Sequence, residues 1–278
     1  MDKNYISFMN KNTLVVTTET NESPHSEKSK TGTQSIERVV QMLRIVASRG
    51  KAGMRIGEIA TTSGLPHSTC FRMLHRLEYE GLLDRDAHTR KYFLGPLLYE
   101  LGLLARPRYR LSELCDGALQ KLAEVTQDTI YLSERSGLEA VCTLRALGDY
   151  PIKSLALDVG IRRPLGVGAG GLAILCALPP DEAESIIEAN APKYEKYGFV
   201  SADYLREAIK VGRNQGYAFL DSVVTPGTAA IGIAFPPENP IAALSVAAIS
   251  GRLDSLRRDE VARLLRQQIR IICGTMSR

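Results

Sequence analysis

Residues Ile56 to Asp84 read IGEIATTSGLPHSTCFRMLHRLEYEGLLD, and the spacing of the apolar residues predicts two helices joined by a tight turn. Cys70, Leu74 and Leu77 recur at the i, i+4, i+7 spacing of one buried helical stripe. Gly64 can adopt the positive φ that a sharp turn between helices needs. Pro66 suits the start of the second helix, where its missing N–H leaves no bond unmade. This pattern is typical of a helix-turn-helix.

The other side of the second predicted helix is polar and basic, as a DNA-reading face would be. Gly81 to Leu83 predicts a strand that leaves the helix, and Lys91 to Leu94 predicts the returning strand. Such a hairpin would form a wing whose Arg85, Arg90 and Lys91 reach phosphates. The predicted DNA contacts are His67, Ser68, Thr69, Phe71, Arg72, His75, Arg76 and Arg90. Arg72 is the best candidate for a contact to guanine. An ordinary helix pair with a solvated polar face remains the alternative.

The composition favours a two-domain protein of the cytoplasm. The chain has 278 residues, a net charge of +4 and five cysteines, and no run of about 18 apolar residues that could span a membrane. The first residues lack the pattern of a secretory signal. The cysteines are scattered without a C-x-x-C pair, and the four histidines lack metal-ligand spacing, so we expect a reducing compartment and no bound metal. Residues 31–105 carry ten basic and seven acidic side chains.

A glycine-rich segment, Gly166 to Gly171, matches the G-x-G-x-x-G pattern of dinucleotide-binding loops and precedes a predicted helix at Leu172–Ala177. Its context differs from that of a nicotinamide site, because the region about 20 residues further on reads as helix rather than strand end. We therefore expect no cofactor, although a nicotinamide-dependent oxidoreductase remains an alternative. Backbone N–H groups at the start of a helix also favour a small anion such as a carboxylate.

Several stretches together resemble the isocitrate-lyase-regulator (IclR) family of bacterial transcription factors. They are GLPHSTCFRMLHRLEYEGLL, KYFLGPLLYELG, VGIRRPLGVGAGGLAIL, GYAFLD and AALSV, and the resemblance covers about Thr33 to Cys273. It implies an α+β protein with an N-terminal winged helix-turn-helix, a linker helix and a C-terminal GAF-like α/β effector-binding domain with a curved, mostly antiparallel sheet. It also implies a ligand-responsive regulator that binds double-stranded operator DNA as a homodimer or tetramer.

The chain is expected to divide into four parts. These are a flexible tail at 1–32, the winged domain at 33–95, the linker helix at 96–107 and the effector-binding domain at 108–278. Ser35 is predicted to cap a first helix whose inner stripe includes Ile36, Val40 and Val46. Ser201 is predicted to cap a later helix that Gly216 ends. Ile152–Asp158 is predicted to be a strand.

The resemblance also implies where an effector binds. The matching positions are Ile152, Leu155, Ala169, Gly170, Leu220, Asp221, Thr228, Ala230 and Ser245. Gly166 and Gly168 stand where many members have a histidine and a threonine or serine. Because fewer polar groups then line the pocket, we expect an organic acid with an apolar or aromatic body.

An enzyme is not expected. No nucleophile motif occurs, and His88 is the last histidine of the chain, so the second domain lacks the commonest general base. No catalytic residue is therefore assigned. A small-molecule sensor whose winged domain contacts proteins instead of DNA remains a further alternative.

Overall fold

The computed structural model describes residues 33–276. The chain divides into two compact units, one ending at Tyr109 and the other beginning at Arg110. The tail expected at residues 1–32 lies outside the described residues. Among the helices that the structure describes, none is both long enough and apolar enough to cross a membrane.

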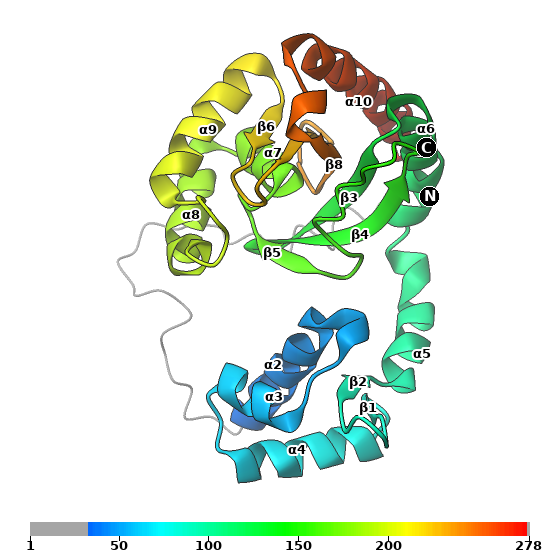
Figure 1. Cartoon of the computed structure of the whole chain (residues 1–278), viewed down its shortest axis with the longest axis vertical. Helices are drawn as coiled ribbons and strands as arrows, with labels where there is room; N and C mark the ends of the chain where they lie inside the picture. The colour runs from blue at the N-terminus through cyan, green and yellow to red at the C-terminus, as the bar shows by residue number, and fades with distance from the viewer. Residues whose placement is uncertain (1–32, 277–278) are drawn as a thin grey trace. The chain divides into compact units, whose positions relative to one another are not determined.

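The first unit is a three-helix core followed by a hairpin (Figure 1). Its elements are α2 (Gln34–Ser48), a 3-10 turn (Gly50–Ala52), α3 (Ile56–Ser63), α4 (His67–Tyr79), β1 (Leu83–Arg85), β2 (Tyr92–Leu94), α5 (Pro96–Ala105) and a second 3-10 turn (Arg106–Arg108). Helix α3 contacts both α2 and α4. Met42, Ile59 and Leu74 from these helices are fully buried together. The predicted helix-turn-helix is therefore confirmed.

The turn between α3 and α4 forms as the sequence indicates. Gly64 ends α3 in the left-handed conformation, with φ of 68°. Pro66 lies one residue before α4 with an extended backbone. The N–H of Arg55 donates to Glu58 Oε2 at 2.8 Å, which closes the start of α3. β1 and β2 pair antiparallel, with Leu83 opposite Leu94, and Met54 adds a bridge to Tyr92.

Two expectations for the first helix were wrong. α2 begins at Gln34, so Ser35 lies inside the helix and Thr33 occupies the capping position. Ile36 is 64% exposed and Val40 is 40% exposed, whereas Met42 and Val46 are buried. The predicted stripe is therefore right at Val46 and wrong at Ile36 and Val40, which face away from the core.

The second unit is a six-stranded antiparallel sheet in the order β5-β4-β3-β8-β7-β6. The strands are β3 (Thr129–Ser136), β4 (Glu139–Leu147), β5 (Arg162–Pro164), β6 (Ala218–Asp221), β7 (Thr228–Phe235) and β8 (Ala242–Ile249). The helices are α6 (Leu111–Thr126), α7 (Ala169–Ala177), α8 (Pro180–Tyr194), α9 (Ala202–Gln215) and α10 (Ser255–Met276), with a 3-10 turn at Ser250–Arg252.

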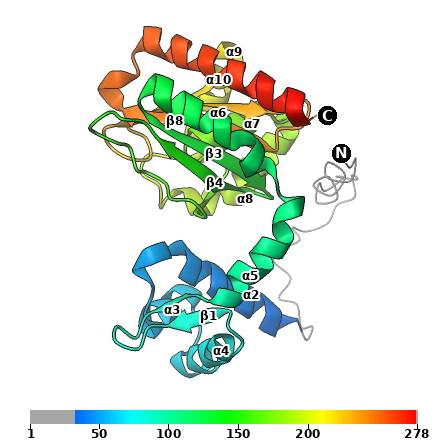
Figure 2. The ribbon, with the colours of Figure 1, turned by 90° about the vertical axis from the view of Figure 1, so that its right-hand side faces the viewer.

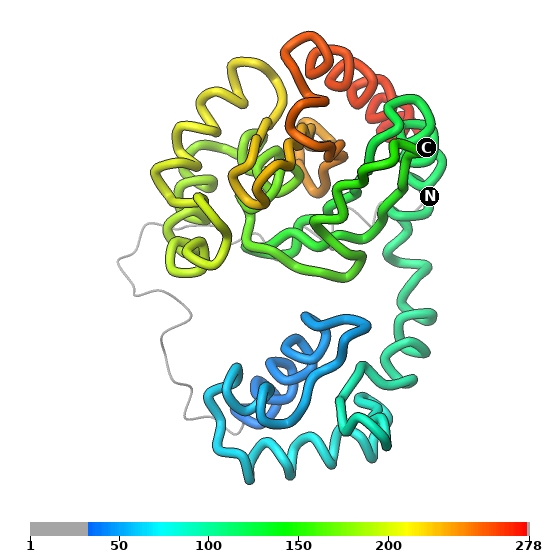
Figure 3. The backbone as a smooth tube through the Cα atoms, in the orientation of Figure 1, coloured from blue at the N-terminus to red at the C-terminus, as the bar shows by residue number. Residues whose placement is uncertain are grey.

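Helices cover both faces of this sheet. α6 and α10 lie side by side on one face (Figure 2) and share a core with Ile130, Leu132 and Leu244. α7 packs on the other face against β3, β7 and β8. α8 and α9 run side by side beyond α7, as the backbone tube in Figure 3 shows. The sheet therefore presents one inner surface to α7, and that surface is where a ligand could lie.

The helix boundaries around α7 and α9 are partly as expected. Ser201 Oγ accepts a hydrogen bond from the N–H of Tyr204, and Gly216 ends α9 in the left-handed conformation, which confirms both predictions. α7 begins at Ala169, three residues before the predicted start. Ile152–Asp158, in contrast, is not a strand. The short strand before α7 is β5, and residues 151–158 form an irregular segment.

Candidate DNA-binding surface and ligand pocket

The outer face of α4 is open along its length. His67, Ser68, Arg72, His75 and Arg76 are exposed and Thr69 is half-buried. Phe71 is 51% exposed, so its ring is accessible to a partner. Cys70, Leu74 and Leu77 hold the opposite face in the core. Substitution of the outer residues should therefore leave the core intact.

The side chains on this face differ in how free they are. Arg72 forms no ion pair or side-chain hydrogen bond within residues 33–276. Arg76 pairs with Glu80 one turn along α4 and lies 5.0 Å from the ring centroid of Tyr79. The rings of Phe71 and His75 are parallel, with centroids 6.3 Å apart. Arg72 is thus the guanidinium most available to a partner, and Arg76 already has a carboxylate.

The wing offers fewer free cations than its sequence suggests. Arg85 lies over the ring of Tyr92, 5.4 Å from its centroid, and Lys91 Nζ donates to the carbonyl of Ala52 at 2.8 Å. Asp86 accepts from the N–H and the hydroxyl of Thr89, and these bonds lower the pKa of Asp86. Arg90 adopts a positive φ of 59° at this tip and is exposed. Arg90 is therefore the basic wing residue best presented to a phosphate.

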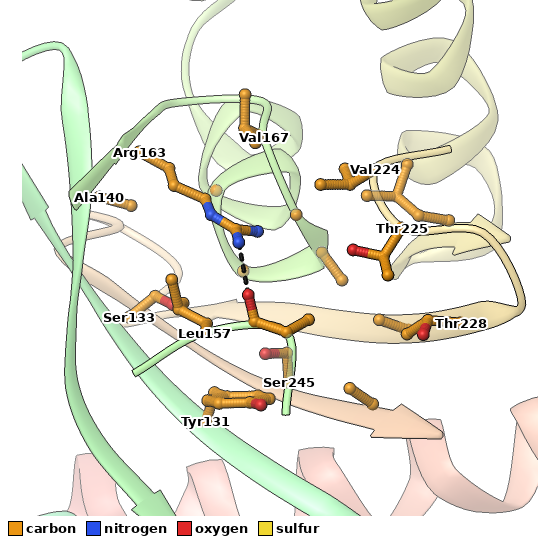
Figure 4. A pocket seen from close by; sticks show the side chains of 18 of the residues that line it. Tyr131, Ser133, Ala140, Leu157, Arg163, Val167, Val224, Thr225, Thr228 and Ser245 are labelled. Carbon is orange, nitrogen blue, oxygen red and sulfur yellow. Dashed lines mark hydrogen bonds between the residues drawn. The ribbon is translucent and has the colours of Figure 1, made fainter. Parts of the chain in front are cut away.

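A cavity lies between α7 and the inner surface of the sheet (Figure 4); the empty space in it and in the open solvent at its mouth amounts to about 690 Å³. It is lined by Tyr131, Ser133, Ala140, Ala156, Leu157, Arg163, Val167, Gly168, Ala169, Gly170, Gly171, Leu220, Val223, Val224, Thr225, Thr228, Ala230, Ser245 and Ala247. The lining is mostly apolar with a few polar groups, which is the usual composition of a small-molecule site.

Six of the nine residues expected around an effector line this cavity. They are Ala169, Gly170, Leu220, Thr228, Ala230 and Ser245. Ile152 and Leu155 do not, since each is 58% exposed, and Asp221 is also exposed outside the lining. Because residues 151–158 are irregular rather than a strand, Ala156 and Leu157 reach the cavity in their place.

The start of α7 points unpaired donors into the cavity. Ala169, Gly170 and Gly171 form the first turn, where N–H groups have no acceptor within their own helix. The helix can approach the sheet this closely because residue 232 is glycine: a Cβ there would lie 2.5 Å from the carbonyl oxygen of Ala169. An anion is the natural partner of such a helix end.

Two serine hydroxyls stand beside this helix end. Ser133 and Ser245 are each 5% exposed, and neither hydroxyl has a hydrogen-bond partner in the part of the chain that the structure describes. A Cβ on Gly170 would lie 2.7 Å from Ser133 Oγ and 3.7 Å from Ser245 Oγ. Ser133 was missed in the sequence. Its signal was a serine two residues after Tyr131, on the opposite face of β3 from Ile130 and Leu132.

The phenol of Tyr131 and the guanidinium of Arg163 complete the polar lining. Tyr131 Oη donates to the carbonyl of Ser154 at 2.8 Å, and burial raises the pKa of Tyr131. Arg163 Nη2 donates to the carbonyl of Ala156, the bond drawn in Figure 4. Arg162, the preceding residue, donates to Glu139 and Ser136 instead. The cavity thus holds one guanidinium.

The surroundings of the glycine-rich segment differ from those of a nicotinamide-binding loop. Burial raises the pKa of the nearby Cys142 thiol to about 11, so its thiolate is scarce at neutral pH. No cluster of three metal-ligating side chains occurs among the residues described. The sheet is antiparallel, whereas a dinucleotide loop of this pattern joins a strand and a helix of a parallel βαβ unit. The glycines instead serve the close start of α7.

Comparisons with known proteins agree with both halves of this description. The model of the IclR helix-turn-helix domain matches residues 35–87, and the model of the bacterial transcriptional regulator IclR C-terminal domain matches residues 107–274. The chain is 29% identical over 205 residues to the HTH-type transcriptional regulator KipR of Bacillus subtilis, which covers 73% of this chain and 81% of that protein.

Solved structures share the fold. An IclR family transcriptional regulator from Brucella abortus matches with a TM-score of 0.70 at 20% identity, covering 91% of this chain and 96% of that one. An IclR homolog from Microbacterium hydrocarbonoxydans, crystallised with 4-hydroxybenzoate, matches with a TM-score of 0.68 at 21% identity, covering 86% and 97%. With one family model over more than half of its length and a second over its helix-turn-helix, the chain belongs to the IclR family of ligand-responsive bacterial transcriptional regulators.

Proposed function

We propose that this regulator binds its operator with the outer face of α4 and that a small organic acid bound beside α7 alters that binding. The observation that supports the proposal is that each unit has polar groups without a partner in the described chain, on an outer surface in the first unit and inside a cavity in the second. The first unit exposes the uncompensated guanidinium of Arg72. The second keeps unpaired donors of α7, Ser133 and Ser245 inside a cavity.

For the DNA contacts, α4 lies in a major groove. Ser68, Thr69, Phe71 and Arg72 meet base edges there, where Arg72 can bond guanine through two hydrogen bonds and Phe71 can meet a thymine methyl. His67 lies at the start of the helix, and His75, Arg76 and Arg90 contact phosphates, which fix the register without reading sequence. The free state of Arg72 and the exposure of Phe71 support this assignment.

One recognition helix contacts only a few base pairs. A dimer can place two such helices on two half-sites of a longer operator. α5 has no buried residue, and Tyr99, Leu101, Leu103 and Leu104 are exposed by 70%, 50%, 47% and 80%. A contiguous exposed apolar surface of this kind marks an interaction site. We assign α5 to the interface of a homodimer, which can pair further into a tetramer.

The effector is a small organic acid. Its carboxylate suits the first turn of α7, and its apolar body suits the side chains of Leu157, Leu220 and Val224. The relative crystallised with 4-hydroxybenzoate carries an acid of this class. The effector can shift DNA binding only by the difference between its affinities for the DNA-bound and free states.

A gel-shift titration of the full chain on the intergenic DNA upstream of its own gene tests the proposal. We expect a specific complex that competitor DNA of unrelated sequence does not remove, and a change in its midpoint when organic acids are added. A chain that binds both DNAs equally would contradict operator recognition. A chain that binds neither DNA would favour the sensor that acts through protein contacts.

A further inference from the structure

Arg163, Arg258 and Arg266 are partly buried arginines of the second unit that form no ion pair within the described residues, and of these three only Arg163 lines the cavity. Arg135, Arg145, Arg162, Arg206, Arg252 and Arg257 each form an ion pair with an aspartate or glutamate. Arg163 has no carboxylate within 4.0 Å among residues 33–276. None of the side chains that line its cavity is acidic. A partly buried guanidinium without a counter-charge favours a ligand that supplies one.

The surroundings of Arg163 reinforce this reading. Burial lowers the pKa of Arg163, and the groups that raise it are tyrosines and a cysteine rather than carboxylates. The guanidinium has five N–H donors. The structure uses one of its nitrogens, in the bond to the carbonyl of Ala156. The others remain available on a planar group that faces the cavity (Figure 4).

Arg163 shares the cavity with the start of α7. Both are positive, one as a full charge and the other as the end of a helix dipole. The Ser133 and Ser245 hydroxyls are also free there. The guanidinium and the helix end would both attract the same anion. Tyr131, Leu157 and Val224 contribute apolar side-chain surface to the lining.

We propose that Arg163 is the residue that selects the charge of the effector, by pairing with its carboxylate. The proposal rests on the proposed function and names its substrate class more closely: a monocarboxylate with an apolar body. A neutral analogue of the same shape would leave the guanidinium without a counter-charge. A cationic analogue would be repelled, and a dianion would find only one guanidinium in the cavity.

The test uses pairs of probes that differ in charge but hardly in shape, such as benzoate with benzamide and cyclohexanecarboxylate with its amide. Binding to the full chain is measured by calorimetry. For the natural protein we expect at least one acid to bind on the order of 10 to 100 times more tightly than its amide, the range that a charged hydrogen bond supplies. Equal binding of acid and amide in every pair, or no binding of any acid, would overturn the proposal.

Arg163→Met keeps the length of the side chain and removes its charge. We expect the preference for the acid to fall to within about threefold of unity, while the affinity for the amide changes little. Arg163→Lys keeps the charge but not the planar fork, so a preference should persist at an intermediate level. A full preference in Arg163→Met would assign the carboxylate to α7 alone and contradict the proposal. If Arg163→Met does not fold, Arg163→Lys and the natural protein still decide the outcome.

Arg162→Met is the matched control. Arg162 is the neighbour of Arg163 and carries the same charge, but its side chain pairs with Glu139 and does not line the cavity. Its preference for the acid should equal that of the natural protein, and an equal loss would show that only total charge matters. Failure of this inference is separate from failure of the proposed function. A chain that shifts its operator DNA but does not prefer acids remains a regulator with a different effector.

Discussion

α4 and α7 use their surfaces in opposite ways. α4 buries one stripe of side chains, exposes the other and offers its partner long polar side chains from the middle of the helix. α7 is buried from Ala169 to Leu175 and offers the backbone N–H groups of its first turn. A DNA backbone is reached by flexible cations, whereas a small anion in a cavity is held by fixed dipoles. The two helices should therefore tolerate mutation very differently.

The largest effect of a substitution should be a loss of stability caused by a clash beside α7. In Gly232→Ala the new Cβ would meet the carbonyl of Ala169 at 2.5 Å, so α7 or β7 must move. We expect a loss of about 3 kcal/mol in the free energy of unfolding of the second unit, measured by urea denaturation. Gly117→Ala on α6, where a Cβ meets nothing within 4 Å, is the control and should be neutral or stabilising. Equal stability of the two variants would break the comparison.

On α4, Arg72→Ala should weaken operator binding by about 1–3 kcal/mol. The melting temperature should not change, because the side chain is exposed and unpaired. Fluorescence anisotropy with labelled operator measures the affinity. Arg263→Ala removes the same charge from an exposed position on α10 and should bind DNA normally. An Arg72→Ala variant with unchanged affinity would remove this residue from the interface.

Beside α7, Ser245→Ala removes one free hydroxyl and should weaken effector binding by about 1 kcal/mol. Calorimetry with the carboxylate that gives the largest thermal shift measures the loss. Ser185→Ala on the exposed side of α8 should have no effect on that affinity. If Ser245→Ala binds as tightly as the natural protein, the hydroxyl does not contact the ligand.

The smallest effects should come from phosphate contacts. Arg90→Ala should reduce the slope of log affinity against log salt concentration by about 0.9. Arg76→Ala should reduce it by less, because Glu80 already pairs with Arg76. Anisotropy titrations at several salt concentrations measure both slopes. A larger change for Arg76→Ala would mean that the ion pair with Glu80 opens on DNA.

Local rules predicted the elements that short-range chemistry determines. Gly64 and Gly216 end helices in the left-handed conformation, and Ser201 caps α9, because each of these roles depends on a few neighbouring residues. The prediction that Ser35 caps α2 used the same kind of rule and was wrong. A hydroxyl residue near a helix start is common, and the sequence does not say which residue begins the helix.

The irregular segment at residues 151–158 could not be predicted locally. Its alternating apolar residues favour a strand, yet its carbonyls accept bonds from side chains distant in the sequence. Tyr131 bonds Ser154, Arg163 bonds Ala156, and Arg145 bonds Leu157. These contacts place Ala156 and Leu157 at the cavity and leave Ile152 and Leu155 in solvent. For the same reason Ser133 was not recognised as a cavity residue from the sequence.

The position of β8 at the centre of the sheet has a consequence for synthesis of the protein. β3 pairs on one side with β4, its neighbour in sequence, and on the other with β8, so that Thr129 lies opposite Ala247. Domains fold as units from the N-terminus during translation, and the first unit is complete by Tyr109. The cavity lacks Ser245 and Ala247 until β8 leaves the ribosome. In a nascent chain the helix-turn-helix unit can therefore fold well before the ligand cavity of the second unit is complete.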